Sequence, residues 1–301
     1  MIRARAQSSV PSLFAALLLA LAQPGHAREP NRALAGLPQT AGDHVLINDG
    51  FTVGYSERLG SPLWVVYRAS RITNRRYSPR PRFHRDPRSR RGVTWFDYLH
   101  SGYDRGHMAP NFLMSNLYGR GAQRDSFLMT NVTLQSPRLN QLLWQRLEEV
   151  EADYLAPRWQ ALWVTAGPIF SDADRHTESG LAIPEAFYRL WLDRKENGRL
   201  RALALIVPQK VRGDERLDRF VVSVDAVERR TGLDFYTRLP DAEENPLEAA
   251  AADPVAWGLT RHACDPARYA ENWQGRDGIT LVFDRCRNVN RKGKTRHERK
   301  D

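Results

Sequence analysis

The feature that most constrains the fold of this chain is one apolar stripe between residues 139 and 154. Its side chains recur at spacings of three and four, at Leu139, Leu142, Leu143, Leu147, Val150 and Tyr154. This spacing is typical of a helix that buries one face. A second helix is predicted at residues 224–231, with Ser223 as N-cap and Gly232 as C-terminal stop. Strands are predicted before and after the long helix, and this order favours an α+β domain.

Alternating apolar residues predict most of these strands. Between residues 44 and 67 the alternation is interrupted at Asp49-Gly50 and at Gly60-Ser61-Pro62, which predict tight turns. Further strands are predicted at residues 127–130, 162–166, 187–192 and 200–207. We expect the last two of these to pair with each other.

The first 27 residues have the pattern of a secretory signal peptide. Arg3 and Arg5 precede an apolar run at residues 13–22, and Gly25 and Ala27 are small residues at the cleavage positions. The run is shorter than the about 20 residues that span a bilayer, and its unbroken apolar character argues against an amphipathic mitochondrial presequence. We therefore expect a secreted or periplasmic protein with no membrane association after signal removal, and mitochondrial import as the less favoured alternative.

The mature chain is long enough to bury one substantial core. We expect its main domain at residues 28–245 and a C-terminal extension at residues 246–301, ending in a basic tail that should be disordered. The extension contains both cysteines of the chain, Cys264 and Cys286. In an oxidising compartment their simplest state is a disulfide, and two unrelated thiols are the alternative.

The basic side chains are concentrated in two segments. The formal net charge is +10, and it falls to +8 without Arg3 and Arg5. Residues 68–91 hold ten arginines against one acid, and residues 285–301 hold eight basic side chains against two acids. Aromatic residues and prolines are interleaved with the arginines at 68–91, which favours a long loop that binds a polyanion. A solvated basic loop is the alternative.

Residues 103–148 gather side chains suited to chemistry at a phosphate ester. His107 has an ordinary pKa of about 6.5, so its imidazole can accept a proton near neutral pH. Arg105 offers a fork of donors to phosphate oxygens, and Gly106 permits close backbone approach beside them. Asp104 is expected to be structural and to pair with Arg105 or another basic group.

Asn140 and Glu148 are candidates for a metal site. An amide oxygen suits Mg²⁺ and leaves the cation its full charge, whereas the alternative for Asn140 is an N-cap of the long helix. Glu148 lies about 12 Å further along an α-helix and about 80° around it, so both residues cannot easily bind one ion directly. We expect Glu148 to organise water around the metal. Its alternative is a solvent-facing glutamate paired with Arg146 or a neighbour.

These motifs together resemble the DNA/RNA non-specific endonuclease family. The resemblance rests on Asp104-Arg105-Gly106-His107, on Thr130-Asn131 with Gln135, and on Leu139-Asn140-Gln141 with Trp144 and Glu148. It continues through residues 51–55, 64–67, 166–170, 183–184 and 231–235, so it covers about residues 44–240. It implies an α+β fold with a ββα-metal nuclease core, built around a mixed or antiparallel sheet with flanking helices.

The resemblance also implies roles for individual residues. His107 would be the general base, Arg105 a phosphate contact, Asn140 the direct ligand of Mg²⁺ and Glu148 the organiser of its water. Mn²⁺ or another divalent ion could replace Mg²⁺. The resulting reaction is hydrolysis of DNA and RNA to 5′-phosphate and 3′-hydroxyl ends, with little base specificity.

Other positions of the motif would complete the site. Asn131 would belong to the catalytic residues and Gln135 to the substrate-binding ones. An upstream arginine would also contact the phosphate, and Arg80, Arg82 and Arg85 all match its position. The alternatives to an endonuclease are a secreted nucleic-acid-binding protein without activity and a phosphodiesterase for smaller nucleotides. A homodimer is compatible with the sequence. The sequence does not identify an inhibitor protein.

Overall fold

The computed structural model describes residues 33–39, 44–159, 161–171, 175–278 and 280–283. These residues belong to one compact unit. Within these ranges no helix is both long and apolar enough to cross a membrane. The predicted signal peptide and the basic tail lie outside the described residues.

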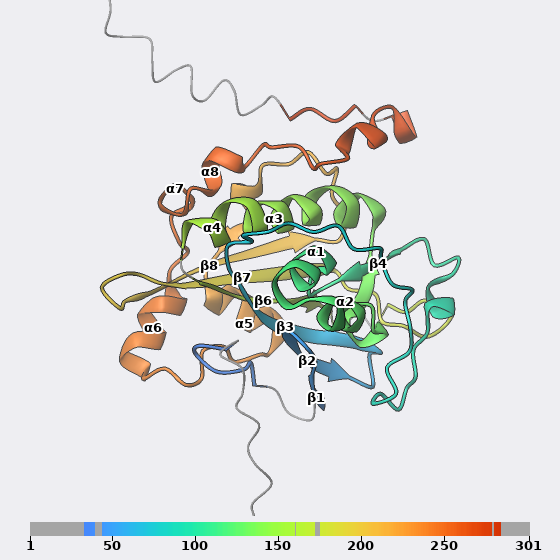
Figure 1. The fold of residues 1–301 in the computed structure, drawn as a ribbon, viewed down its shortest axis with the longest axis horizontal. Coiled ribbons are helices and arrows are strands. Elements are labelled where there is room, and N and C mark those ends of the chain that lie inside the picture. The colour runs from blue at the N-terminus through green and yellow to red at the C-terminus, as the bar shows by residue number, and fades with distance from the viewer. Residues whose placement is uncertain (1–32, 40–43, 160, 172–174, 279, 284–301) are drawn as a thin grey trace, which may run out of the picture. The chain divides into compact units, whose positions relative to one another are not determined.

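A seven-stranded antiparallel sheet is the central layer (Figure 1), with strand order β1-β2-β3-β6-β7-β8-β9. Its strands are β1 His44–Ile47, β2 Phe51–Ser56, β3 Ser61–Ala69, β6 Leu162–Ile169, β7 Ala186–Arg194, β8 Leu200–Pro208 and β9 Val221–Val222. The predicted strands and turns between residues 44 and 67 are confirmed, and so is the pairing of β7 with β8. Gly50 adopts a φ of 84° in the turn between β1 and β2, a conformation that glycine tolerates best.

A separate two-stranded sheet carries the central motif. Strand β4 (Asp104–His107) pairs antiparallel with β5 (Val132–Gln135). The strand predicted at residues 127–130 is wrong. Its backbone instead bonds to His84 of the basic loop, and a 3₁₀ turn follows at Met129–Asn131. The true strand escaped the alternation rule because all four residues of β5 are buried.

The long helix runs beside the sheet as predicted. It consists of a π-helical turn at Leu139–Trp144, α3 at Gln145–Val150, a second π-helical turn at Glu151–Leu155 and α4 at Ala156–Arg158. Most of its apolar stripe packs on the sheet together with α1 (Asn111–Leu113), a π-helical turn (Met114–Tyr118) and α2 (Arg120–Ser126). Leu142 packs instead against the C-terminal extension. The α+β class is therefore confirmed.

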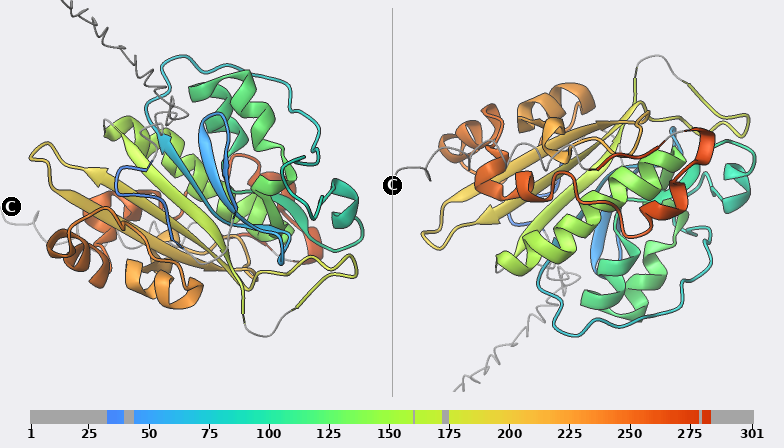
Figure 2. Two further views of the ribbon diagram at one scale, coloured as in Figure 1. Left: turned by 90° about the horizontal axis from the view of Figure 1, so that it is seen from below. Right: turned by 90° about the horizontal axis from the view of Figure 1, so that it is seen from above.

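The opposite face of the sheet has its own apolar core, covered by α5 (Val224–Thr231). As predicted, the Ser223 side chain accepts a hydrogen bond from the Ala226 backbone, and Gly232 ends the helix with a φ of 68°. Helix α6 (Asp241–Ala249) contacts α5 on this side. Figure 2 shows α5 and α6 in orange across the sheet from α3 in green.

The C-terminal extension packs on the domain. It continues from α6 through α7 (Pro254–Trp257), α8 (Leu259–His262) and 3₁₀ turns at Ala270–Trp273 and Arg276–Gly278. Trp257 and Leu259 are buried in the core beneath the long helix. Cys264 is not a free thiol, but Cys286 lies outside the described residues, so the predicted disulfide stays a prediction.

Candidate active site

Asp104 links the motif strand to the long helix. Its Oδ2 accepts hydrogen bonds from the Asn140 side-chain amide at 2.9 Å and from the Gln141 amide at 2.7 Å. Its expected pairing with Arg105 is therefore wrong. Because a carboxylate can only accept, the amide NH₂ of Asn140 must face Asp104, and the Asn140 carbonyl oxygen is turned elsewhere. That oxygen makes no hydrogen bond to a described residue and remains available to a cation.

Asn140 is not an N-cap. The helix begins before it, and its backbone N–H already bonds to the Ser136 carbonyl. The turn that contains Asn140 is π-helical. The rotation expected between Asn140 and Glu148 assumed an uninterrupted α-helix, so that value does not apply here.

His107 is held by aromatic rings from two other segments. Phe127 meets it edge-on at 4.7 Å between ring centroids, and Phe83 of the basic loop lies at 5.2 Å. The Arg105 guanidinium lies over the Phe83 ring, 5.1 Å from its centroid. The buried Nε2 of His107 has no hydrogen-bond partner among the described residues.

The pKa of His107 is lowered to about 3. Burial is the largest cause, and the positive charges of Arg80 and Arg105 add to it. Each disfavours the imidazolium form. At neutral pH the side chain is therefore a neutral imidazole that can accept a proton.

The pKa of Glu148 is shifted in the opposite direction to that of His107. Its pKa is raised to about 8, by burial first and by the nearby carboxylates of Glu151 and Glu149, against the opposing influence of Arg189 and Arg80. No described residue hydrogen-bonds its carboxylate. The alternative pairing with Arg146 is wrong, because that guanidinium donates instead to the backbone carbonyls of Gly213, Glu215, Ala263 and Asp265.

Arg189 is a functional candidate that the sequence reasoning missed. It lies on β7, fully buried, and pairs with Glu151 at 2.8 Å. Tyr67 and Trp191 also hydrogen-bond Glu151. The guanidinium lies 4.9 Å from the Trp144 ring centroid, beneath the helix that carries Glu148. Its signal in the sequence was an arginine inside an otherwise apolar strand.

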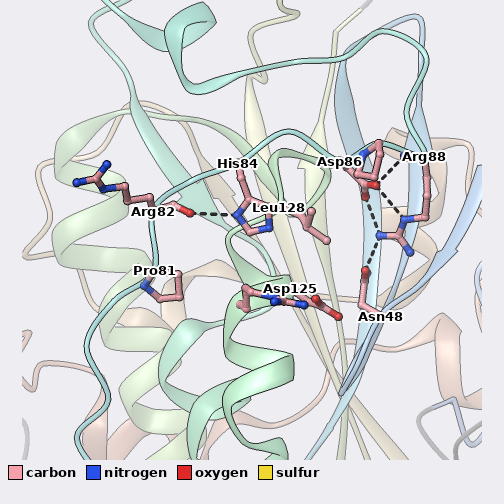
Figure 3. Close-up of a pocket in the computed structure, with 10 residues that line it drawn as sticks. Asn48, Pro81, Arg82, His84, Asp86, Arg88, Asp125 and Leu128 are labelled. Carbon is pink, nitrogen blue, oxygen red and sulfur yellow. Dashed lines mark hydrogen bonds and ion pairs between the residues drawn. The ribbon is translucent and has the colours of Figure 1, made fainter.

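The three candidate upstream arginines lie in different surroundings. Arg80 acts electrostatically on both His107 and Glu148. The Arg85 guanidinium instead packs against Gly92. Arg82 lines a pocket of about 580 Å³ together with Asp86 and other residues, and its guanidinium points away from Asp86 there (Figure 3).

The basic loop, residues 68–91, uses much of its charge to hold itself in place. Arg75 pairs with Asp153 at 2.5 Å, and Arg88 pairs with the buried Asp86 at 2.7 Å. Further arginines of the loop bond to the rest of the domain, namely Arg71, Arg90 and Arg91. Four arginines of the loop are exposed, and their guanidinium groups make no hydrogen bond or ion pair to a described residue: Arg76, Arg80, Arg82 and Arg85. Only part of the loop's charge is therefore open to a polyanion.

Asn131 and Gln135 differ sharply in how their amides are used. The Asn131 side chain accepts from the Ala109 N–H and donates to the carbonyls of Ala109 and Ser126, so all its bonding goes to backbone. Gln135 is equally buried, yet neither atom of its amide has a partner. A Cβ on Gly106 would lie 2.0 Å from the Gln135 Oε1. Gly106 therefore makes room for the Gln135 side chain. This role adds to the close backbone approach that the sequence predicted for Gly106.

Comparisons with known proteins identify relatives of this chain. Human mitochondrial endonuclease G is 29% identical over 221 residues, which cover 68% of this chain and 72% of that protein. Mouse mitochondrial nuclease EXOG is 30% identical over 158 residues, which cover 48% of this chain and 42% of that protein. The solved structure of an EndoG/EndoGI complex shares the fold, with a TM-score of 0.60 and 22% identity over 71% of this chain and 93% of that one. Residues 29–242 match the family model described as DNA/RNA non-specific endonuclease, so this chain belongs to that family.

Proposed function

We propose that this protein is a divalent-metal-dependent endonuclease that hydrolyses phosphodiester bonds of both DNA and RNA. The observation that carries the proposal is the junction of β4 with the long helix. There a neutral His107, Arg105 and the Asp104-oriented Asn140 come from one strand and one adjoining helical turn. Family membership over residues 29–242 supports the same activity.

His107 is proposed as the general base. It takes a proton from the water that attacks phosphorus, while the bond from phosphorus to the 3′ oxygen breaks and leaves a 5′-phosphate. A positioned base of this kind contributes about 10² to 10⁴ in rate. Its low pKa in the free protein is partly due to Arg80 and Arg105. A bound phosphate offsets these charges, which raises the pKa of His107 towards the range where a base works best.

Arg105 and Arg80 are proposed to hold the scissile phosphate. Both lie close enough to His107 to affect its ionisation, whereas Arg82 and Arg85 lie in other surroundings. Guanidinium groups suit this task because their planar fork matches two phosphate oxygens. We assign Arg82 and Arg85, with Arg76, to longer-range attraction of the nucleic-acid backbone.

Asn140 is proposed to bind the metal through its side-chain carbonyl oxygen, with Glu148 in support. The residues fit such an ion because Asp104 fixes the amide and because the Glu148 carboxylate has no partner among the described residues. When bound, Mg²⁺, Mn²⁺ or a similar cation supplies positive charge that offsets the charge developing on the phosphate and leaving oxygen. Asn131 is proposed to position the segment after His107, and the unpartnered amide of Gln135 to face the substrate.

A cleavage assay tests the proposal. The mature protein should degrade both plasmid DNA and RNA with Mg²⁺, and a chelator should stop it. His107→Ala should retain binding and lose cleavage by orders of magnitude. Intact substrates under every metal condition would favour a binding protein. Faster turnover of a small diester than of long DNA, without strong salt dependence, would favour a small-nucleotide phosphodiesterase.

We propose export as the fate of the chain, from the pattern of residues 1–27. The mitochondrial location in the names of its relatives is the alternative. Sequencing the N-terminus of the mature protein and locating it by fractionation distinguishes the two. A new N-terminus near residue 28 in the periplasm or medium supports export.

A further inference from the structure

A second cluster of oxygen ligands lies across the sheet from the candidate active site. Asp225 and Glu228 occupy one side of α5, three residues apart, and Glu248 comes from α6. One carboxylate oxygen from each lies within 4.8 Å of the others. The cluster thus joins α5 to α6, the helix that leads into the C-terminal extension; Figure 1 labels both helices.

Buried oxygen atoms in this cluster lack partners. Glu248 is only 6% exposed, and its Oε1 makes no hydrogen bond. The hydroxyl of Tyr236, a residue 5% exposed, also has no partner. Tyr236 is close enough to feel the charges of Glu248 and Glu228, yet it bonds to neither. Buried polar groups are rarely left unsatisfied, so the unpartnered Oε1 of Glu248 points to a missing ligand at the cluster.

The largest charges acting on Glu248 are negative. After burial, the influences on Glu248 are the carboxylates of Glu228, Glu244, Asp225 and Asp234, and together they raise its pKa to about 8. Arg230, on the same helix as Glu228, is exposed and pairs with Glu185 instead. Two like charges about 4 Å apart repel by about 4 kcal/mol at an effective dielectric constant of about 20. Either a proton or a cation must relieve this repulsion.

We propose that Asp225, Glu228 and Glu248 form a divalent cation site that takes Ca²⁺ in preference to Mg²⁺. One oxygen from each carboxylate lies within 4.8 Å of the others, close enough for all three to bind one cation. Three carboxylates in a loosely defined geometry suit Ca²⁺, whereas Mg²⁺ demands near-ideal octahedral geometry at shorter distances. The ion ties α6 to α5 and so anchors the extension. This site is separate from the proposed catalytic metal, and it does not depend on the proposed function.

The test uses the mature protein carrying Asn140→Ala, so that the candidate catalytic metal site is removed. Calorimetry should show one bound Ca²⁺. Saturating Ca²⁺ at about 100 times Kd should raise Tm by about 5 °C or more over the chelated protein. Adding Glu248→Gln or Asp225→Asn should abolish both effects. Adding Glu243→Gln, an exposed acid on α6, should leave both unchanged.

Two results would overturn the proposal. One is an Asn140→Ala protein that binds no Ca²⁺ at millimolar concentration, which would leave a proton on Glu248 as the explanation. The other is an undiminished Ca²⁺ response in both folded double variants, which would place the ion elsewhere. Far-ultraviolet circular dichroism establishes that each variant is folded. If one of the two double variants does not fold, the other decides the outcome.

Discussion

Replacing Asp104 by alanine should weaken metal binding more than it weakens chemistry. Asp104 holds the Asn140 amide at 2.9 Å and the Gln141 amide at 2.7 Å with one oxygen. Without it, the Asn140 amide can rotate and present NH₂ to the cation for part of the time. Hydrogen bonds to a charged acceptor contribute about 1.5–3 kcal/mol each. Some of this returns when water bonds to the released amides.

The expected loss is therefore about 10- to 100-fold in metal affinity, the usual effect of removing a group that orients a ligand. In free energy this is about 1.4–2.7 kcal/mol. The assay is plasmid cleavage against Mg²⁺ concentration. The half-saturating Mg²⁺ should rise by that factor in Asp104→Ala. The rate at saturation should fall less than about tenfold, because His107 stays on the same strand.

Asp104→Asn is the matched control. Its side-chain carbonyl can occupy the same place and accept both hydrogen bonds, so it should retain most of the metal affinity. Gln141→Ala removes the other donor and should change little. A wild-type Mg²⁺ dependence in Asp104→Ala would refute the idea that Asp104 orients the metal ligand. Equal losses in the alanine and asparagine variants would show that charge matters, not orientation.

Three further outcomes are expected. Because the pKa of His107 is lowered to about 3, the unfolded chain protonates first as pH falls below about 6.5. Between pH 7 and pH 5 the wild type should therefore lose about 2 kcal/mol of unfolding free energy that His107→Gln does not lose. Guanidinium denaturation at both pH values measures this difference. Arg189→Met should raise the pKa of Glu148 and so move the rising limb of the pH–rate profile to higher pH, whereas Arg189→Lys should leave it in place. An unmoved limb in the methionine variant would contradict this. Arg80→Ala should lower kcat/KM on DNA by about 10- to 100-fold, whereas Arg85→Ala should stay within about twofold.

Local signals in the sequence predicted the elements that few residues determine. The alternation before residue 67 and the caps around α5 act over one turn or one strand, so the sequence alone specifies them. The four buried residues of β5 carry no alternation, and the prediction moved to residues 127–130 instead. There the backbone bonds to His84, more than forty positions earlier in the chain, a contact that no local pattern encodes.

In the candidate site, too, local sequence predicted some features and missed those that depend on distant contacts. Residue types identified His107, Arg105 and Asn140 as candidates, because each type has a preferred chemistry. The partner of Asp104 could not be identified, since it comes from a helix 36 residues later. Arg189 escaped for a related reason: only the packing of β7 against the long helix places its charge beneath Glu148.

The pKa values of His107 and Glu148 are shifted in opposite directions. Burial and positive neighbours hold the pKa of His107 at about 3, while burial and neighbouring carboxylates hold that of Glu148 at about 8. A phosphate near Arg80 and Arg105 relieves the first shift, and a cation near Asn140 relieves the second. The phosphate therefore raises the pKa of His107 towards the range where a base works best, and the cation favours the ionised carboxylate of Glu148. Because the cation and the phosphate carry opposite charges and would bind at the same junction, substrate and metal should strengthen each other's binding, by the same factor in either order.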